Sequence, residues 1–436
     1  MRVQRSRIDI PEAHRANFKH LYLDIGWFGL LSGSAMAFIS IYLVRIGASA
    51  LQIGLLNAAP AVMAIGLALP AGRWLGGRAI DRAVFGMSVL HRFFYLAWIP
   101  LPALLFDAVE VTVVITVTFL MSAPGTVLAV GFNAMFADAV PAEWRGHVVG
   151  IRNALLAVVT IVTSLLCGFL LDATPFPANY QIVFGLGFLG AMMSSYHLHR
   201  VRISREDRIR TGLTMGDLAQ PGIIRTLGDA LRPGVAWRYF TQRRSFRLPR
   251  AEILRGAFGP VLLSLFLFHL TQYLAIPLFP IYWVERLGLN DQVISLGNAL
   301  FYAFVFLGST QIRRLTDRLG PRGVTAAGAL MMSAYPGLTA VTTDVTLFLV
   351  TSIVGGAAWS LAGGALSNYL LEQIPEDDRP TYLAWYMLVT NLAVLAGSLL
   401  GPAMARVIGL VPALAVIALG RVVSAAGIWK LGSAEK

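Results

Sequence analysis

Long apolar stretches dominate this chain, and short polar turns separate them. Each stretch is about 20 residues long, which at 1.5 Å per residue lets an α-helix cross roughly 30 Å of hydrocarbon. The apolar residues run continuously, whereas the strands of a membrane β-barrel alternate apolar and polar residues. In lipid only helices and closed barrels satisfy all their backbone hydrogen bonds. The pattern therefore predicts an all-α polytopic membrane protein.

Twelve apolar stretches fit the chain, six in each half. The predicted spans are residues 21–44, 51–71, 84–106, 110–136, 147–171, 180–199, 256–283, 292–311, 323–341, 345–371, 381–405 and 410–430. We interpret residues 1–20 as a cytoplasmic tail rather than a signal peptide, because no short apolar core with a cleavage site follows them. The predicted domains are a first bundle at 21–200, a linker at 201–255, a second bundle at 256–430 and a short tail at 431–436.

Composition excludes an ordinary soluble protein. The chain has 436 residues, of which 56% are hydrophobic and 13% charged, whereas soluble domains average about 45–50% apolar and about 25% charged residues. Its single cysteine, Cys167, can form no intrachain disulfide, and no Cys/His spacing typical of a metal site occurs. The spans hold no convincing pair of nucleophile and base, so we expect no catalytic site, metal or cofactor.

The net charge of +12 is distributed unevenly. Most arginines lie in the linker at 201–255 or in turns predicted on the same side, which is the positive-inside pattern. This pattern indicates topology rather than nucleic-acid binding. It predicts a protein of a prokaryotic inner or plasma membrane with both termini in the cytoplasm. Only Arg45, Arg286 and Arg406 then remain as basic residues at the outer face.

The linker contains apolar residues near helical spacing, namely Leu218, Ile223, Ile224, Leu227 and Leu231. With the surrounding arginines they are typical of an amphipathic helix on an anionic inner leaflet. A solvated linker without regular structure is the alternative interpretation.

An internal repeat relates the two halves. Gly77-x-x-x-Asp81-Arg82 after the second span matches Asp317-Arg318-x-Gly320 after the eighth, with the two aspartates 236 residues apart. The segment from Asp138 to Arg145 matches the segment from Glu372 to Arg379, each with an acid, a proline and an arginine in register at an offset of 234 residues. Chance matching of apolar helices does not readily place these polar residues in register.

These motifs resemble the charged turns of the major facilitator superfamily. The resemblance covers nearly the whole chain, although Val84 and Phe85 replace the later Gly and Arg of the family's first turn. It implies two pseudo-symmetric six-helix bundles that rock about a central pathway. It also implies a cytoplasmic gate formed by Gly77, Asp81, Arg82, Asp138, Arg145, Asp317, Arg318, Gly320, Glu372 and Arg379. The alternative is that these turns only fix topology.

Ionisable groups inside a membrane are costly and therefore candidates for function. Asp24 in the first span and His269 in the seventh are the candidates for proton coupling, although Asp24 could instead pair with Lys19 or a turn arginine. We interpret Arg92 as a snorkelling or structural residue and Arg152 as a gate or snorkelling residue.

Polar and aromatic residues of spans 7, 8 and 11 are the candidates for binding the solute. They are His269, Gln272, Tyr273, Asn298, Tyr302, Trp385, Tyr386 and Asn391. Hydrogen bonds between helices would account for the asparagines equally well.

Together the pattern predicts a monomeric secondary active transporter of a small organic solute, driven by an ion gradient, most simply of protons. Scarce charge within the spans favours efflux of amphiphilic compounds or drugs by antiport. An uptake carrier for sugars or other metabolites is the alternative within transport. A non-transporting receptor or a lipid scramblase on the same fold is the alternative from another class.

Overall fold

The computed structural model describes residues 12–76, 78–105, 107–203, 251–375 and 378–431. Within these ranges the chain is almost entirely helical and contains no strand. The first half comprises α1 (Glu12–Leu31), η1 (Ser32–Met36), α2 (Ala37–Arg45), α3 (Ala50–Gly76), α4 (Ile80–Phe93), α5 (Tyr95–Trp98), α6 (Leu101–Leu104), α7 (Asp107–Ala139), α8 (Ala142–Ala173) and α9 (Ala178–Arg200). The second half comprises η3 (Ala251–Leu254), α13 (Phe258–Ala275), α14 (Leu278–Ile281), η4 (Tyr282–Arg286), α15 (Asp291–Ser309), α16 (Ile312–Met331), α17 (Ala334–Val341), α18 (Val345–Glu372), α19 (Arg379–Ile408) and α20 (Leu410–Leu431).

Consecutive elements combine into twelve paths across the bilayer, which confirms the predicted fold class. Eleven of these paths, among the residues described, are long and apolar enough to span a membrane. The twelfth is α9, whose 23 residues include polar side chains such as Asn179, Ser194 and Ser195 that are buried against the other helices. Those side chains lower the hydropathy of α9 without facing lipid.

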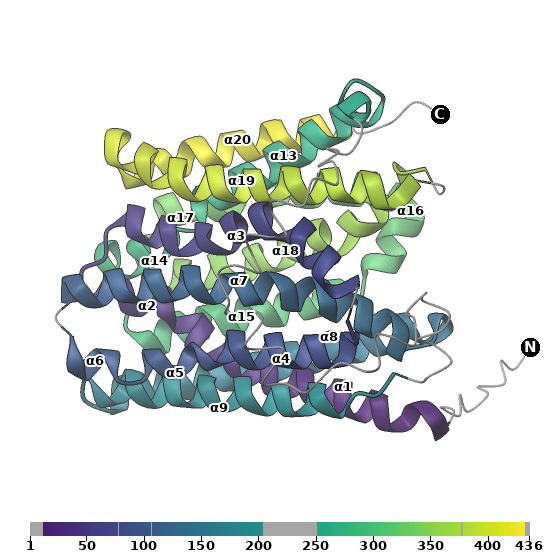
Figure 1. The fold of residues 1–436 in the computed structure, drawn as a ribbon. Coiled ribbons are helices and arrows are strands. Elements are labelled where there is room, and N and C mark those ends of the chain that lie inside the picture. Colours follow the sequence, from purple (N-terminus) through teal and green to yellow (C-terminus); the bar gives the residue numbers. More distant parts are fainter. Residues whose placement is uncertain (1–11, 77, 106, 204–250, 376–377, 432–436) are drawn as a thin grey trace, which may run out of the picture.

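The two ends of the molecule are distinguished by chain direction. In Figure 1, α1 begins and α20 ends at the same end, which we call the inner end; the opposite end, where α2 finishes at Arg45, is the outer end. Because the helices alternate in direction, Asp81 at the start of α4 and Asp317 near the start of α16 both lie at the inner end. This common position is what the internal repeat requires.

Several helices extend beyond the predicted spans. α1 begins at Glu12, inside the segment interpreted as a tail, and α16 begins at Ile312, so Asp317 and Arg318 lie on a helix rather than in a turn. The break in α16 comes at Gly320, whose φ of 69° is one that side chains other than glycine rarely adopt. Apolar runs mark only the part of a helix that lies in hydrocarbon, and charged residues can continue the helix into the headgroup region.

Three predictions fall outside the described residues. They concern Gly77, the amphipathic helix around 218–231 and the tail beyond residue 431.

Four long helices join the two bundles. α3 of the first bundle packs along α19 of the second, and α8 packs along α15; Figure 1 shows α3 beside α19. Near the outer end the backbones are very close: a Cβ added at Gly54 would lie 2.1 Å from the backbone oxygen of Ser398, and one at Gly168 would lie 2.1 Å from Ser295 Oγ. Glycine permits this approach because it has no side chain.

The buried apolar clusters show where the bundles are joined. One cluster at the outer end combines many residues of the first bundle with Ile281, Leu289, Ile294 and Phe348 of the second. At the inner end there are two separate clusters. One contains only first-bundle residues, and the other contains only second-bundle residues. The two bundles therefore share a core at the outer end, whereas each has its own core at the inner end.

Candidate functional site

An ion pair connects the two bundles at the outer end. Arg45, the last residue of α2, donates from Nε (3.0 Å) and Nη2 (2.9 Å) to Oδ1 of Asp291, the first residue of α15. Its Nη2 also donates to the backbone oxygen of Leu289 at 2.9 Å. Both donors converge on the same carboxylate oxygen, and hydrogen bonds between two charged groups are stronger than those between neutral groups.

Two further residues of the first bundle hold the same aspartate. Tyr180 of α9 donates its hydroxyl to Asp291 Oδ2 at 3.1 Å. Asp172, at the end of α8, accepts from the backbone N–H groups of Asp291 (3.2 Å) and Gln292 (3.1 Å). A carboxylate at a helix N-terminus is stabilised by the helix dipole, so Asp172 caps a helix of the opposite bundle. We call Arg45, Asp172, Tyr180 and Asp291 the outer gate.

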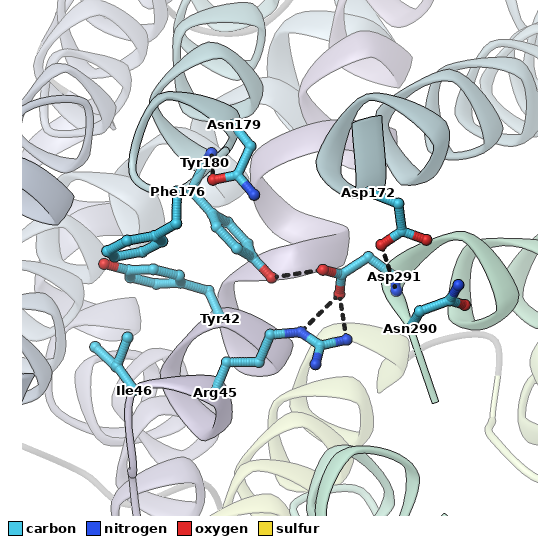
Figure 2. Close-up of a pocket in the computed structure, with 9 residues that line it drawn as sticks. All are labelled: Tyr42, Arg45, Ile46, Asp172, Phe176, Asn179, Tyr180, Asn290 and Asp291. Atoms are coloured by element: carbon cyan, nitrogen blue, oxygen red, sulfur yellow. Dashed lines mark hydrogen bonds and ion pairs between the residues drawn. The ribbon is translucent and has the colours of Figure 1, made fainter. Parts of the chain in front are cut away.

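The outer gate surrounds a small hollow of about 390 Å³. Figure 2 shows Asp291 between Arg45, Tyr180 and Asp172, with Tyr42 and Phe176 on the neighbouring wall. The side chain of Asp291 is only 7% exposed, whereas that of Arg45 is 29% exposed. Because a buried carboxylate that loses its partners is costly, the gate favours tight closure of the outer end.

Aromatic packing behind the gate fixes Tyr180. Its ring lies 4.5 Å from that of Tyr42, and Tyr42 donates its hydroxyl to Glu110 at 2.5 Å. Glu110 is 1% exposed. The position of the Tyr180 hydroxyl is thus determined by side chains of α2 and α7 as well as by its own helix.

Part of the predicted solute site comes together between α13 and α19. His269 Nε2 lies 3.2 Å from the Tyr386 hydroxyl, and His269 is 8% exposed. Trp385, also 8% exposed, and Gln272 each have a buried polar atom, Nε1 and Oε1, without a hydrogen-bond partner among the described residues. Buried polar groups normally have partners, so these atoms are suited to bind a polar ligand. Tyr273 also lies on α13 and is half-buried.

The remaining predicted solute residues form no hydrogen bond with His269 or Tyr386 among the described residues. Asn391 donates to the backbone oxygen of Met387 in its own helix at 2.8 Å. Asn298 and Tyr302 are on α15. Tyr302 is 42% exposed.

Asp24 is the centre of a buried charge cluster in the first bundle. Arg152 of α8 donates from both terminal nitrogens to its Oδ2 at 3.1 Å, and Arg92 of α4 lies 3.9 Å from its Oδ1. Ser194 of α9 donates to the same carboxylate. Arg92 and Arg152 are only 5% and 7% exposed. The two arginines therefore do not snorkel to water, and Asp24 pairs with them rather than with Lys19.

The inner-end residues of the predicted gate are mostly at the surface. Asp317, Arg318 and Glu372 are exposed, whereas Asp81 and Asp138 are half-buried and Arg82 is exposed in the first turn of α4. Arg379 is the first residue of α19.

Arg145 makes its hydrogen bonds within the first bundle. It donates to the backbone oxygens of Val140 (3.1 Å) and Ala137 (2.6 Å) at the end of α7. In this conformation Arg145 therefore links the start of α8 to the end of α7.

Sequence reasoning missed the outer gate. Arg45 stood out as one of three basic residues at the outer face, but Asp172, Tyr180 and Asp291 were not singled out. The usable signal was the presence of aspartates at the outer ends of two predicted spans together with that unusual arginine. An outer-face arginine opposes the positive-inside bias and therefore needs another explanation.

The second bundle also matches a known family by sequence. Residues 261–433 match the family model described as Major Facilitator Superfamily. By sequence, the second bundle is therefore similar to members of this superfamily. A search of curated proteins finds no sequence match.

Solved structures of several transporters have the same fold over nearly the whole chain. A D-xylose–proton symporter is 15% identical, with a TM-score of 0.69 and coverage of 96% of this chain and 98% of the symporter. The xylose transporter XylE from E. coli, in a partially occluded inward open conformation, is 16% identical, with a TM-score of 0.64 and coverage of 95% and 97%. The nucleoside transporter NupG is 11% identical, with a TM-score of 0.62 and coverage of 95% and 98%. At these identities the likeness concerns the fold.

Proposed function

We propose that the whole chain is a member of the major facilitator superfamily and a secondary active transporter that moves a small organic solute by alternating access. The observation that carries the proposal is the outer gate, which joins the bundles through Asp291 while the inner ends keep separate cores. In this proposal the conformation described is the one open toward the inner side. The other conformation breaks the outer gate and brings the inner-end charged segments together.

The energies involved suit a reversible switch. Hydrogen bonds to charged groups are worth about 1.5–3 kcal/mol each, and a bias of a few kcal/mol holds one state without making the other inaccessible. Moving a two-state equilibrium from 1:99 to 99:1 requires about 5.5 kcal/mol. Loss of the outer-gate contacts and gain of comparable contacts at the inner end would supply a change of this size.

For the solute we propose an uncharged polar molecule that binds beside His269 and Tyr386 on the second bundle. The unsatisfied Trp385 Nε1 and Gln272 Oε1 offer one donor and one acceptor, which suits hydroxyl or amide groups. The fold likeness to transporters of xylose and nucleosides supports an uptake carrier of this kind. Tyr273, Asn298, Tyr302 and Asn391 would complete the lining.

Export of amphiphilic compounds is the second candidate. The cluster between α13 and α19 is rich in aromatic rings and has no formal charge apart from what His269 can gain. Such a lining also suits lipophilic compounds, which antiport would expel.

For coupling we propose protons, with Asp24 as the first candidate and His269 as the second. Protonation of Asp24 would remove the carboxylate charge that binds Arg92 and Arg152. Those arginines come from α4 and α8, so the loss of that charge would loosen the contacts of α1 with both helices. The proposal places the protein in a prokaryotic inner or plasma membrane as a monomer with cytoplasmic termini.

Reconstitution tests the proposal. Purified protein in proteoliposomes, with an inward proton gradient, is incubated with labelled sugars, nucleosides and lipophilic cations. Saturable uptake that an ionophore abolishes supports proton-coupled import, and ionophore-sensitive extrusion supports the second candidate. Lipid flip-flop without solute movement, or binding without transport, would contradict both candidates in favour of a scramblase or a receptor.

A further inference from the structure

A second cavity lies at the inner end of the first bundle. It has a volume of about 590 Å³ and lies between the first turn of α4 and the end of α9. Its lining consists of Asp81, Arg82, Tyr196, His199, Arg200, Val201, Arg202 and Ile203. We call it the inner pocket.

The inner pocket is strongly basic. Three arginines and a histidine line it against a single aspartate. Arg200 is held in place, because its Nη2 donates to the Tyr196 hydroxyl at 2.8 Å and its guanidinium lies 5.1 Å from the Tyr196 ring. A positioned guanidinium with several N–H donors is suited to bind phosphate.

The backbone around Arg202 is fixed by α1. Asn17, which is 7% exposed, accepts from the Arg202 N–H at 2.9 Å and donates to the Arg202 carbonyl at 2.7 Å. This pair of hydrogen bonds anchors the chain just beyond α9. The two arginines at 200 and 202 are therefore presented from a rigid support.

The helices that form the inner pocket carry exposed apolar side chains. Tyr196, which lines the pocket, is 45% exposed, and further along the same two helices Leu189 of α9 is 49% exposed and Phe93 of α4 is 56% exposed. On membrane-spanning helices such large apolar side chains contact acyl chains. Tyrosine at the end of a span is typical of the headgroup level. The basic pocket thus lies at the end of two helices whose exposed apolar side chains continue from it into the membrane.

We propose that the inner pocket binds the phosphate of an anionic phospholipid from the inner leaflet, with Arg200 and Arg202 as its main contacts. Basic pockets between membrane helices on the cytoplasmic side bind anionic headgroups by this chemistry. The exposed apolar side chains that continue along α4 and α9 from the pocket favour a lipid, with its acyl chains, over a soluble phosphate. Because Asp81 and Arg82 line the same pocket, a bound lipid contacts one of the proposed inner-gate segments.

Native mass spectrometry of the purified full-length chain tests this proposal. The protein is titrated in detergent with phosphatidylglycerol and, separately, with phosphatidylcholine, and the bound lipids are counted. We expect one tight phosphatidylglycerol site with no equivalent for phosphatidylcholine. Each arginine near an anionic headgroup contributes roughly fivefold in affinity, so the double variant Arg200→Gln/Arg202→Gln should weaken the site about 25-fold.

The matched control is Arg313→Gln/Arg314→Gln. It removes two exposed charges from the start of α16, which also lies at the inner end of the molecule, and it should leave the affinity for phosphatidylglycerol unchanged. Melting temperatures in phosphatidylcholine establish that the variants are folded, and Arg200→Lys/Arg202→Lys keeps the charge if the glutamine variant unfolds. Equal loss in the control and the pocket variant would overturn the proposal, as would equal binding of the two lipids. Displacement of phosphatidylglycerol by millimolar inorganic phosphate alone would assign the pocket to a soluble anion instead.

Discussion

Arg45 and Asp291 are 246 positions apart in the chain, and their side chains form a 2.9 Å ion pair between the two bundles. The pair cannot persist if the outer end opens, because its members are on opposite bundles. In the proposed transport cycle, each opening of the outer end would therefore break the pair and each closure would remake it. The strength of the outer gate would then set the balance between the two proposed conformations.

Asp291→Asn should open the outer end more often. The substitution removes the charge that Arg45 and Tyr180 bind, which we expect to cost the closed state about 1–2 kcal/mol. The native Cys167 reports on this, because it is fully buried in the cluster shared by the bundles at the outer end. Its reaction with a membrane-impermeant maleimide added outside should become roughly 5- to 30-fold faster.

Asp344→Asn is the matched control for that experiment. Asp344 caps α18 by accepting from the Leu347 N–H at 2.9 Å and is not part of the outer gate. Unchanged labelling in Asp291→Asn, or equal acceleration in the control, would show that the ion pair does not hold the outer end.

Gly54→Val should have a similar effect through sterics. A Cβ at this position would lie 2.1 Å from a backbone oxygen of α19, so the closed outer end can form only if α3 and α19 separate. Overpacking of this kind costs about 1–3 kcal/mol, and we expect labelling of Cys167 to become about tenfold faster. Gly66→Val on the same helix is the control, since a Cβ at Gly66 meets nothing within 4 Å. If both variants label at the wild-type rate, the close approach of α3 and α19 does not determine the conformation.

Asp24→Asn should lower the melting temperature and abolish accumulation driven by a proton gradient. It leaves Arg92 and Arg152 buried without their carboxylate, and removing one partner of a buried pair costs about 3–5 kcal/mol. Solute exchange without a gradient should continue in the protein that remains folded. Ser194→Ala separates the loss of stability from the loss of coupling. It removes one hydrogen bond to Asp24 but keeps the carboxylate, so it should lower the melting temperature without abolishing gradient-driven accumulation. Normal gradient-driven accumulation in folded Asp24→Asn would exclude Asp24 as the coupling group.

Tyr386→Phe should weaken solute binding. It removes the hydroxyl beside His269, and a lost hydrogen bond of about 0.5–1.5 kcal/mol corresponds to a 2- to 12-fold rise in KM with a smaller change in the maximal rate. The control is Tyr382→Phe. Tyr382 lies one turn before Tyr386 on α19, where its ring packs against Phe258 in the second-bundle core, so this substitution should leave KM unchanged. Equal KM values for wild type and Tyr386→Phe would remove Tyr386 from the solute site.

The candidate site could be read from the sequence only in part. His269 and Tyr386 were recognised because polar groups are rare and costly inside a span. Asp24 was recognised for the same reason, but its partners were not, since Arg92 and Arg152 lie 68 and 128 residues further along the chain. Which arginine reaches Asp24 depends on the rotation and packing of α4 and α8, and hydropathy does not encode this information.

The sequence by itself determined the number of spans, their common direction in the two halves and the repeat of charged segments at the inner end. These features follow from local chemistry, because apolar length sets where a helix crosses hydrocarbon and arginine placement sets its orientation. Only the tertiary structure decided that the bundles meet at the outer end through Arg45, Asp172, Tyr180 and Asp291. Those contacts depend on how the two bundles pack against each other, and the apolar pattern of the spans does not encode that packing.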